Sequence, residues 1–330
     1  MPELAEARRY APGLLTAAMI ALAATFVAEH YGGPQFLYAL FFGIAFNFLA
    51  SDPKTRPGIE LAARTVLRVG VALLGVRITL DQIASLGLLP ILLVVFAVLA
   101  TIAFGAWLAG LMRRPLAEGL LTGGAVAICG ASAALAISAV LPRSARSSQF
   151  TLLTVVGVTL LSTVAMIVYP LLVRVFHFDD GQAGIFLGGT IHDVAQVVGA
   201  GYIISPQAGD NATFVKLLRV AMLLPVVLVF SLAFRERGED ASRAPLLPWF
   251  LVLFAVLVGV ASAGWAPPAA VDILSKVSRW CLVGAIAALG VKTSFQEFAS
   301  LGWRPVALMV GETLFLGALI LGALLFAGAR

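Results

Sequence analysis

The chain has 330 residues, of which 61% are hydrophobic and only 12% are charged. Soluble proteins carry about 25% charged residues, so this composition excludes an ordinary water-soluble fold and predicts a protein embedded in lipid. The net charge of +5 comes from Lys and Arg in short loops, which indicates membrane orientation rather than a nucleic-acid partner. The apolar stretches are too long for the alternating strands of a β-barrel, so we expect an all-α polytopic membrane protein.

Eleven apolar segments follow one another, if about 20 residues are taken as one span. They cover residues 12–29, 34–50, 59–77, 88–111, 117–140, 150–175, 182–204, 212–234, 246–264, 269–291 and 304–327. We interpret the first as an uncleaved span rather than a signal peptide, because Glu3 and Glu6 precede it and the run is long. The whole chain, 1–330, is expected to be a single transporter domain.

The Lys and Arg residues of the loops predict the orientation. With a cytoplasmic N-terminus, twelve of them fall on the cytoplasmic side and four on the other, as the positive-inside rule requires. The loop at 143–148 places Arg143 and Arg146 on the opposite side. This loop is either a true exception or the sign of a neighbouring re-entrant segment.

One stretch of the sequence occurs twice. Residues 72–90 (ALLGVRITLDQIASLGLLP) and 287–305 (AALGVKTSFQEFASLGWRP) are identical at nine of nineteen positions. The copies fall on the third and tenth spans. Because these are an odd number of spans apart, the copies point in opposite directions through the membrane, as in an inverted-topology repeat. The repeat-related segments are 59–111 and 269–327, and such repeats are typical of transporters.

Two segments, 117–140 and 182–204, differ from ordinary spans because each contains a pair of glycines. Gly123–Gly124 and Gly188–Gly189 are expected to loosen the helical hydrogen-bond ladder, since Gly costs about 1 kcal/mol in a helix interior. Opened backbone at membrane depth would offer the N–H groups of a half-helix to an anion. The alternative is close helix packing through small residues. The two pairs are an even number of spans apart, so simple threading would make these helices parallel.

The second of these segments also holds ionisable residues at membrane depth. His192 and Asp193 follow the Gly pair, and Gln196 lies one turn after His192 on the same face. Ionisable groups inside a membrane cost free energy and are usually functional, so we expect a role in substrate or proton handling. A structural polar cluster is the alternative.

Five basic residues lie inside apolar segments, and only one acid, Asp193, is as deep. The acids Glu60, Asp272 and Glu312 lie nearer the ends of their segments. The basic residues are Arg64, Arg68, Lys216, Arg219 and Arg279. A net positive interior favours an anionic substrate. The alternative is that the long side chains reach the headgroups, which explains Arg279 and Arg64 better than Arg68 and Arg219.

Several enzyme classes leave no trace in the sequence. There is no GxxxxGK[ST] phosphate loop and no HExxH, and three His residues argue against a metal enzyme. Ser132 has no His or Asp close in sequence to activate it, so an intramembrane hydrolase is a weak alternative. We therefore expect no enzyme activity, no metal and no cofactor.

Three stretches together resemble one family: 122–142 (TGGAVAICGASAALAISAVLP), 188–202 (GGTIHDVAQVVGAGY) and 72–87 (ALLGVRITLDQIASLG). They are similar to the YeiH-like family of bacterial membrane proteins, which are described as sulfate exporters. That family is similar to bile-acid/sodium symporters and cation/proton antiporters. The resemblance implies inverted repeats, a panel and a core domain, and discontinuous helices that cross near the midplane, with breaks in 122–132 and 188–196.

The sequence thus predicts a secondary transporter of small anions, sulfate-like by preference, working by alternating access in the bacterial inner membrane. Alternatives are a cation/proton antiporter and an anion channel. Protons or sodium would drive transport, and the protein would form a homodimer. His192 and Asp193 would carry the coupling proton. The expected substrate-binding residues are Arg68, Gly123, Gly124, Cys129, Gly130, Ser132, Gly188, Gly189, Thr190, Gln196, Lys216 and Arg219.

Overall fold

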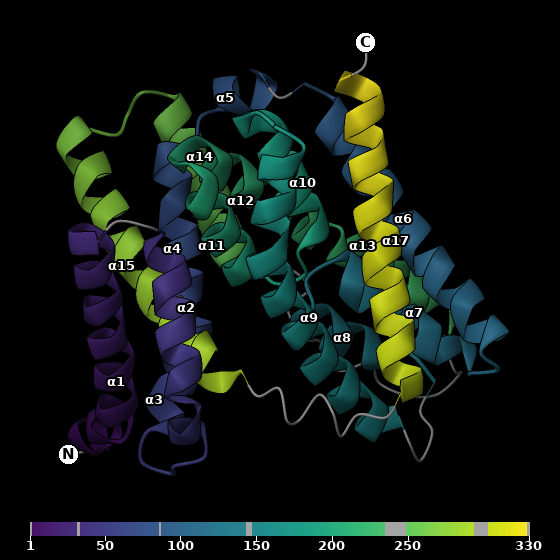
Figure 1. Ribbon diagram of the computed structural model, residues 1–330, viewed down its shortest axis with the longest axis horizontal. Helices are drawn as coiled ribbons and strands as arrows, with labels where there is room; N and C mark the ends of the chain where they lie inside the picture. Colours follow the sequence, from purple (N-terminus) through teal and green to yellow (C-terminus); the bar gives the residue numbers. More distant parts are fainter. Residues whose placement is uncertain are drawn as a thin grey trace. The chain divides into compact units, whose positions relative to one another are not determined.

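The computed structural model describes residues 2–31, 34–85, 87–142, 147–234, 249–293 and 303–328. All regular secondary structure in these ranges is helical, which confirms the expected all-α class (Figure 1). The chain divides into two compact units. Unit 1 comprises Met1–Ser85, Val198–Asp210 and Trp249–Ser294, and unit 2 comprises Leu86–Val197, Asn211–Pro248 and Phe295–Arg330.

Unit 1 holds most of the N-terminal helices and two later ones. They are α1 (Pro2–Tyr31), α2 (Gln35–Ala45), η1 (Asn47–Ala50), α3 (Arg56–Leu61), the π-helical turn η2 (Ala62–Val66), α4 (Leu67–Leu74), η3 (Gly75–Arg77), α5 (Leu80–Ser85), α14 (Trp249–Ser262) and α15 (Pro268–Lys292).

Unit 2 holds the helices in the middle of the chain and the last one. They are α6 (Leu89–Leu111), α7 (Leu116–Ala127), α8 (Ala131–Ser138), α9 (Ser147–Val175), α10 (Asp180–Thr190), α13 (Leu223–Ala233) and α17 (Trp303–Gly328). Helices α11 (Val194–Ile204) and α12 (Pro206–Ala221) are each divided between the units by sequence position.

Helix α15 is the central element of unit 1. It packs against α1, α2 and α4, and its C-terminal half from Leu282 to Val291 is buried apart from Gly284. Gly43 of α2 faces Gly290 of α15, and a Cβ on either glycine would strike the backbone of the other helix. The two helices therefore approach so closely that only glycine fits at the contact.

Helices α6, α7 and α17 form the frame of unit 2. Each of the three contacts the other two, and α9 packs against α7, α8, α10 and α17. Proline in the first turn of α6 and Pro115 just before α7 set the starts of these helices, where a missing N–H costs nothing. Helix α10 begins with a capping box between Asp179 and Gln182.

Six described helices are long and apolar enough to span a membrane. They cover Arg9–Tyr31, Pro90–Leu111, Gln149–Val175, Pro206–Ala233, Pro268–Lys292 and Trp303–Ala327. Four further apolar helices are shorter: Gln35–Ala45, Leu116–Ala127, Val194–Ile204 and Trp249–Ser262. Segments 117–140 and 182–204 each contain one of these four helices and one other short helix, α8 or α10. Helix length therefore does not test the expected count of eleven crossings, which stays a prediction.

The two copies of the repeat occupy equivalent places in the chain. The first joins α4 of unit 1 to α6 of unit 2, and the second joins α15 of unit 1 to α17 of unit 2. Within unit 1, α4 packs against α15. Within unit 2, α6 packs against α17, and Figure 1 shows these two helices side by side. Residues 294–302 of the second copy lie outside the described residues, as do Arg143 and Arg146, and the inverted topology stays a prediction.

Candidate functional site

Two interruptions of helical backbone lie next to each other inside unit 2. The first separates α7 from α8 at residues 128–130, where Gly130 has φ of 63°. The second separates α10 from α11 at residues 191–193, where Ile191 is extended. A Cβ on Gly130 would lie 3.6 Å from the carbonyl oxygen of His192, so the two interruptions are in contact. Ile128, Ile191 and His192 are completely buried.

The glycine pairs do not cause these interruptions, so that expectation was wrong. Gly123 and Gly124 lie within α7, and Gly188 and Gly189 lie within α10, where the ladder continues to the ends of both helices. Their role is packing, since the positions for a Cβ are occupied by neighbouring helices. Gly123 faces α6, Gly124 faces α8, Gly188 faces α12 and Gly189 faces α17. Packing through small residues, the alternative considered above, explains these four glycines.

Lys216 of α12 connects the two interruptions. Its side chain is 0% exposed, and Nζ donates to the carbonyl oxygens of Ile128 at 2.7 Å and Ile191 at 3.0 Å. Both carbonyls belong to residues that follow a helix end and have lost their helical partners. The ammonium group therefore satisfies backbone that would otherwise be unpaired away from water.

Arg219, one turn later on α12, does the same for the last turns of α7 and α10. Nε donates to Ala127 O at 2.7 Å and Nη2 to Val126 O at 2.8 Å. Nη1 donates to Gly188 O at 3.1 Å and Ile191 O at 3.0 Å. A helix C-terminus carries roughly −0.5 charge, so two such ends explain how two cations are held on one helix face.

The start of α11 is occupied by its own polar residues. One carboxylate oxygen of Asp193 accepts a hydrogen bond from Ala195 N at 3.0 Å, as an N-cap does. The backbone N–H of Asp193 donates to the Ser162 hydroxyl of α9 at 2.9 Å, and Gln196 Nε2 donates to Thr163 at 3.4 Å. Gln196 Oε1 is buried and has no partner among the described residues.

The hydrogen bonds of His192 define its tautomer. Thr313 of α17 donates its hydroxyl to Met309 O at 2.7 Å, so His192 Nε2, 2.9 Å from the same hydroxyl oxygen, is the donor in that contact. The other ring nitrogen, Nδ1, is buried and meets no partner within hydrogen-bond distance in the part of the chain that the structure describes. His192 is thus held to α17 through one ring nitrogen.

The start of α8 has no side-chain cap. Gly130 occupies the N-cap position, and the Ser132 hydroxyl donates toward the Cys129 carbonyl oxygen at 3.2 Å and lies 2.9 Å from Cys129 Sγ. The Thr190 hydroxyl bonds to Phe186 O within its own helix. Gly130 itself caps none of the first N–H groups of α8, and the side chains beside them are those of Cys129 and Ser132.

Sequence reasoning missed Glu312, a fully buried acid of unit 2. It lies on α17 and is 0% exposed, and its Oε1 accepts a hydrogen bond from Thr122 of α7 at 2.7 Å. Its Oε2 is buried without a partner among the residues described. The sequence did carry a signal, because any acid within the apolar run 304–327 is a candidate functional residue.

The structure joins most of the predicted residues but leaves Arg68 out. Arg68 belongs to unit 1, where its exposed guanidinium carbon lies 6.0 Å from the ring centroid of Phe250. Arg64 is also exposed in unit 1. Their long side chains and exposure agree with the headgroup interpretation. The predicted residues of the 122–132, 188–196 and 216–219 stretches all belong to unit 2.

Comparison with known proteins identifies the family. A family model described as "Conserved hypothetical protein 698" matches residues 12–309. The UPF0324 membrane protein CT0845 of Chlorobaculum tepidum is 53% identical over 96% of this chain and 90% of its own length. RB0971 of Rhizobium meliloti is 52% identical over 97% of this chain and 94% of its own length. TauZ of Paracoccus pantotrophus is 51% identical over 95% of this chain and 94% of its own length.

No solved structure matches the chain. The similarity to these relatives extends over nearly the whole of both sequences, and it includes the segments that carry the two interruptions. The chain therefore belongs to the UPF0324 family of membrane proteins, which is the YeiH-like family indicated by its motifs.

Proposed function

We propose that the protein is a secondary active transporter of small anions, with sulfate-like oxyanions as the preferred class. One observation carries the proposal: two interrupted helices meet around two fully buried cations in unit 2. Opened backbone inside a membrane protein is tolerated where it serves a binding site, and transporters place substrate sites at such interruptions.

The charges of the cluster favour an anion. Lys216 and Arg219 supply two positive charges. The C-terminal ends of α7 and α10 contribute roughly −0.5 each and the N-terminal ends of α8 and α11 roughly +0.5 each, so the helix ends cancel. Asp193 supplies one negative charge, and about one positive charge remains. We expect the anion at the start of α8, beside Cys129 and Ser132, because the N-terminal end of a helix attracts negative charge.

A buried acid provides a means of coupling to protons. An ionised Glu312 carboxyl lowers the net positive charge of unit 2's buried residues by one, and a protonated carboxyl leaves it unchanged. Anion binding and proton binding then favour each other, as expected for coupled transport. His192 and Asp193 are the other proton carriers that we propose, and Glu312 is added to them.

Alternating access is the proposed mechanism, in the bacterial inner membrane with a cytoplasmic N-terminus. The repeat supports it, because both copies connect a helix of unit 1 to a helix of unit 2. A homodimer remains part of the proposal.

The test is counter-flow of radiolabelled sulfate in proteoliposomes containing the full chain. We expect uptake of labelled sulfate to be accelerated by unlabelled sulfate inside, and to depend on a proton gradient. Glu312→Gln is expected to retain counter-flow and to lose the effect of the gradient, since it keeps the oxygen that Thr122 contacts. Sulfate, sulfite, phosphate and carboxylate fluxes all equal to protein-free liposomes would overturn the proposal.

A cation/proton antiporter is the second candidate, and one observation favours it. Such carriers use paired acids, and two acids of unit 2, Asp193 and Glu312, lie inside apolar segments. In the same liposomes an antiporter would exchange labelled sodium for protons when a pH gradient is imposed. It would not move sulfate. A channel would instead show flux without counter-flow.

A further inference from the structure

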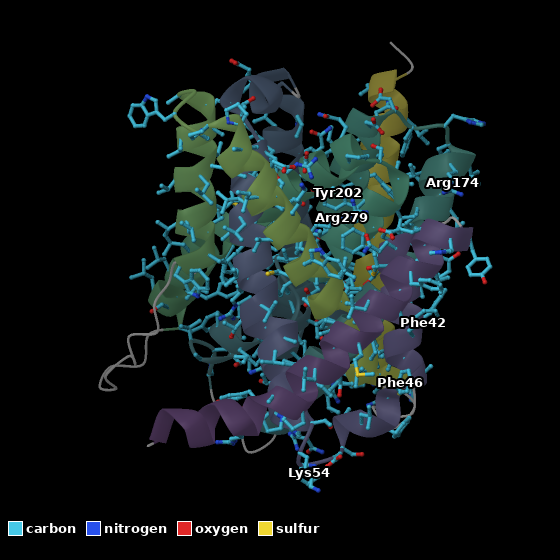
Figure 2. All side chains as sticks on the ribbon, turned by 90° about the vertical axis from the view of Figure 1, so that its left-hand side faces the viewer. Phe42, Phe46, Lys54, Arg174, Tyr202 and Arg279 are labelled. Atoms are coloured by element: carbon cyan, nitrogen blue, oxygen red, sulfur yellow. The ribbon has the colours of Figure 1, made fainter. Side chains whose placement is uncertain are left out.

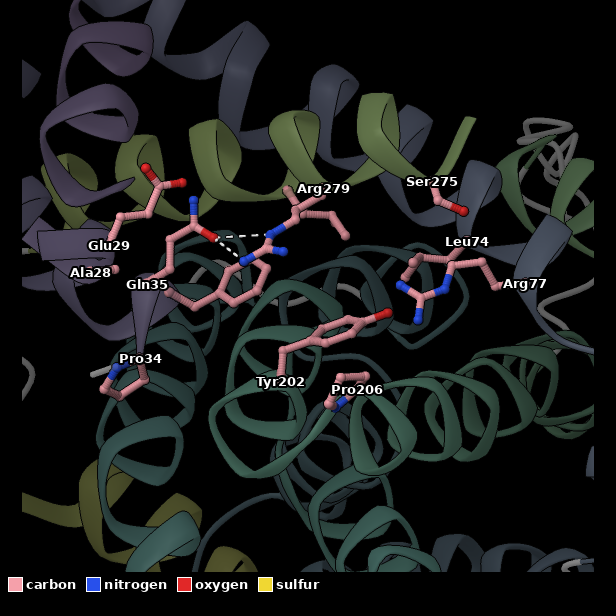
Figure 3. A pocket seen from close by; sticks show the side chains of 12 residues that line it. Ala28, Glu29, Pro34, Gln35, Leu74, Arg77, Tyr202, Pro206, Ser275 and Arg279 are labelled. Atoms are coloured by element: carbon pink, nitrogen blue, oxygen red, sulfur yellow. Dashed lines mark hydrogen bonds between the residues drawn. The ribbon is translucent and has the colours of Figure 1, made fainter. Parts of the chain in front are cut away.

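A cavity of about 420 Å³ is lined entirely by residues of unit 1. Its polar lining comes from Glu29, Gln35, Arg77, Tyr202, Ser275 and Arg279, as Figure 3 shows. The remaining lining is apolar and includes Phe36, Leu74 and Leu282. A volume of this size is typical of sites for small organic ligands, and it is large for a lone inorganic ion.

Arg279 of α15 is held in one orientation by a neutral group. Its Nε and Nη2 donate to the same oxygen, Gln35 Oε1, at 3.0 and 2.8 Å. Gln35 is itself fixed, because its Nε2 donates to Thr25 Oγ1 at 2.6 Å. The third nitrogen, Nη1, has no acceptor in the described chain, and Arg279 forms no ion pair there. The guanidinium group is thus positioned while its charge stays unpaired.

The other basic residue of the cavity is already neutralised. Arg77 pairs with Asp210 at 3.4 Å, and its guanidinium carbon lies 5.9 Å from the centroid of the Tyr202 ring. The Tyr202 hydroxyl donates to the same carboxylate at 2.6 Å. Figure 2 places Tyr202 near Arg279, and in Figure 3 the ring lies between the two guanidinium groups. Arg279 is therefore the group that a ligand can pair with.

From this arrangement we infer that the unit 1 cavity binds an organic oxyanion, whose acidic group pairs with Arg279 and whose apolar body lies along Phe36, Leu74 and Leu282. Ser275, one turn before Arg279 on α15, supplies a further hydroxyl donor. The inference does not depend on the transport proposed for unit 2. The oxyanion comes either from a soluble acid or from the headgroup of an anionic lipid.

The test is binding of benzenesulfonate to the full-length protein in phosphatidylcholine nanodiscs, measured by calorimetry, with neutral benzenesulfonamide as the matched compound. Benzenesulfonate is expected to bind and the sulfonamide to bind about tenfold more weakly, because a charge-assisted hydrogen bond is lost. Arg279→Gln is expected to weaken benzenesulfonate binding by about tenfold or more and to leave thermal unfolding near wild type, since Arg279 is exposed.

Two variants serve as controls. Lys276→Gln removes a positive charge from the same stretch of α15, but Lys276 pairs with Asp272 and does not line the cavity, so binding should not change. Glu29→Gln removes the acid that lines the cavity and should leave binding equal or tighter. Nanodiscs that also contain phosphatidylglycerol distinguish the sources: weaker benzenesulfonate binding indicates a lipid headgroup, and unchanged binding indicates a soluble acid.

Wild-type affinity in Arg279→Gln, or equal affinity for the sulfonamide, would overturn the inference. Loss of binding in Glu29→Gln would also overturn it, because the ligand would then need a cationic group.

Discussion

A buried cation of unit 2 and an exposed cation of unit 1 are used in opposite ways. In unit 2, Arg219 is 1% exposed and donates four hydrogen bonds to backbone carbonyl oxygens. In unit 1, Arg279 donates only to one amide oxygen and keeps Nη1 open. The comparison teaches that depth in an apolar helix does not by itself mark a ligand-binding cation. What matters is which acceptors the protein already supplies.

The strongest test of the comparison is Arg219→Gln. It leaves several buried carbonyls short of a donor, and each unsatisfied group costs about 1–3 kcal/mol, so we expect the largest loss of stability of any variant discussed. Thermal unfolding of the detergent-purified protein measures it. Arg219→Lys keeps the charge but reaches fewer carbonyls, so its melting temperature should lie between those of the wild type and Arg219→Gln. A wild-type melting temperature in Arg219→Gln would show that the carbonyl contacts do not hold the interruptions together.

Gly188→Ala probes the packing of α10 in the same region. The added Cβ would collide with the backbone of Ala212 and the side chain of Val215 on α12, which we expect to cost about 1–3 kcal/mol. The matched control is Gly284→Ala in unit 1, where nothing lies within 4 Å of the new Cβ. The control should be neutral or slightly stabilising, because Ala is the better helix former. Equal melting temperatures for the two variants would contradict the close packing.

Arg77→Gln tests how much a paired cation of unit 1 contributes. The Arg77–Asp210 pair is partly exposed, so its coupling free energy should be about 1 kcal/mol or less. A double-mutant cycle with Asp210→Asn measures that coupling directly. A coupling as large as the loss in Arg219→Gln would remove the distinction between the two units.

Arg68→Ala is expected to have the smallest effect. Arg68 is exposed, and its described contact is a loose one with Phe250, so stability should stay within about 0.5 kcal/mol of wild type and sulfate flux should not change. A large loss of flux would return Arg68 to the anion site, where the sequence had placed it.

The sequence predicted the fold class, because composition and hydrophobic run length depend on each residue alone. It singled out the two interrupted segments by their glycine pairs. It misplaced the interruptions within those segments. Gly has a low intrinsic helix propensity, but in α7 and α10 the absence of a Cβ lets neighbouring helices approach, and the tertiary contact outweighs the propensity. The actual interruptions follow the glycine pairs by a few residues.

Of the site, the sequence identified Lys216, Arg219, His192 and Asp193 as buried polar groups, but it could not give their partners. The acceptors of Arg219 lie as far as 93 residues away along the chain and are backbone oxygens, which no residue pattern marks. Glu312 was passed over because its position in the run 304–327 suggested a place near the helix end. Its burial depends on α7, where Thr122 meets it.

The contacts of α12 also have a consequence for the order in which the protein is made. Chains are synthesised from the N-terminus, and both interruptions enter the membrane before the helix that stabilises them. The carbonyls of Val126 and Ala127 precede their donor by 93 and 92 residues, and that of Ile191 precedes Lys216 by 25. During synthesis the first interruption must therefore be held by water or by the insertion machinery until α12 arrives.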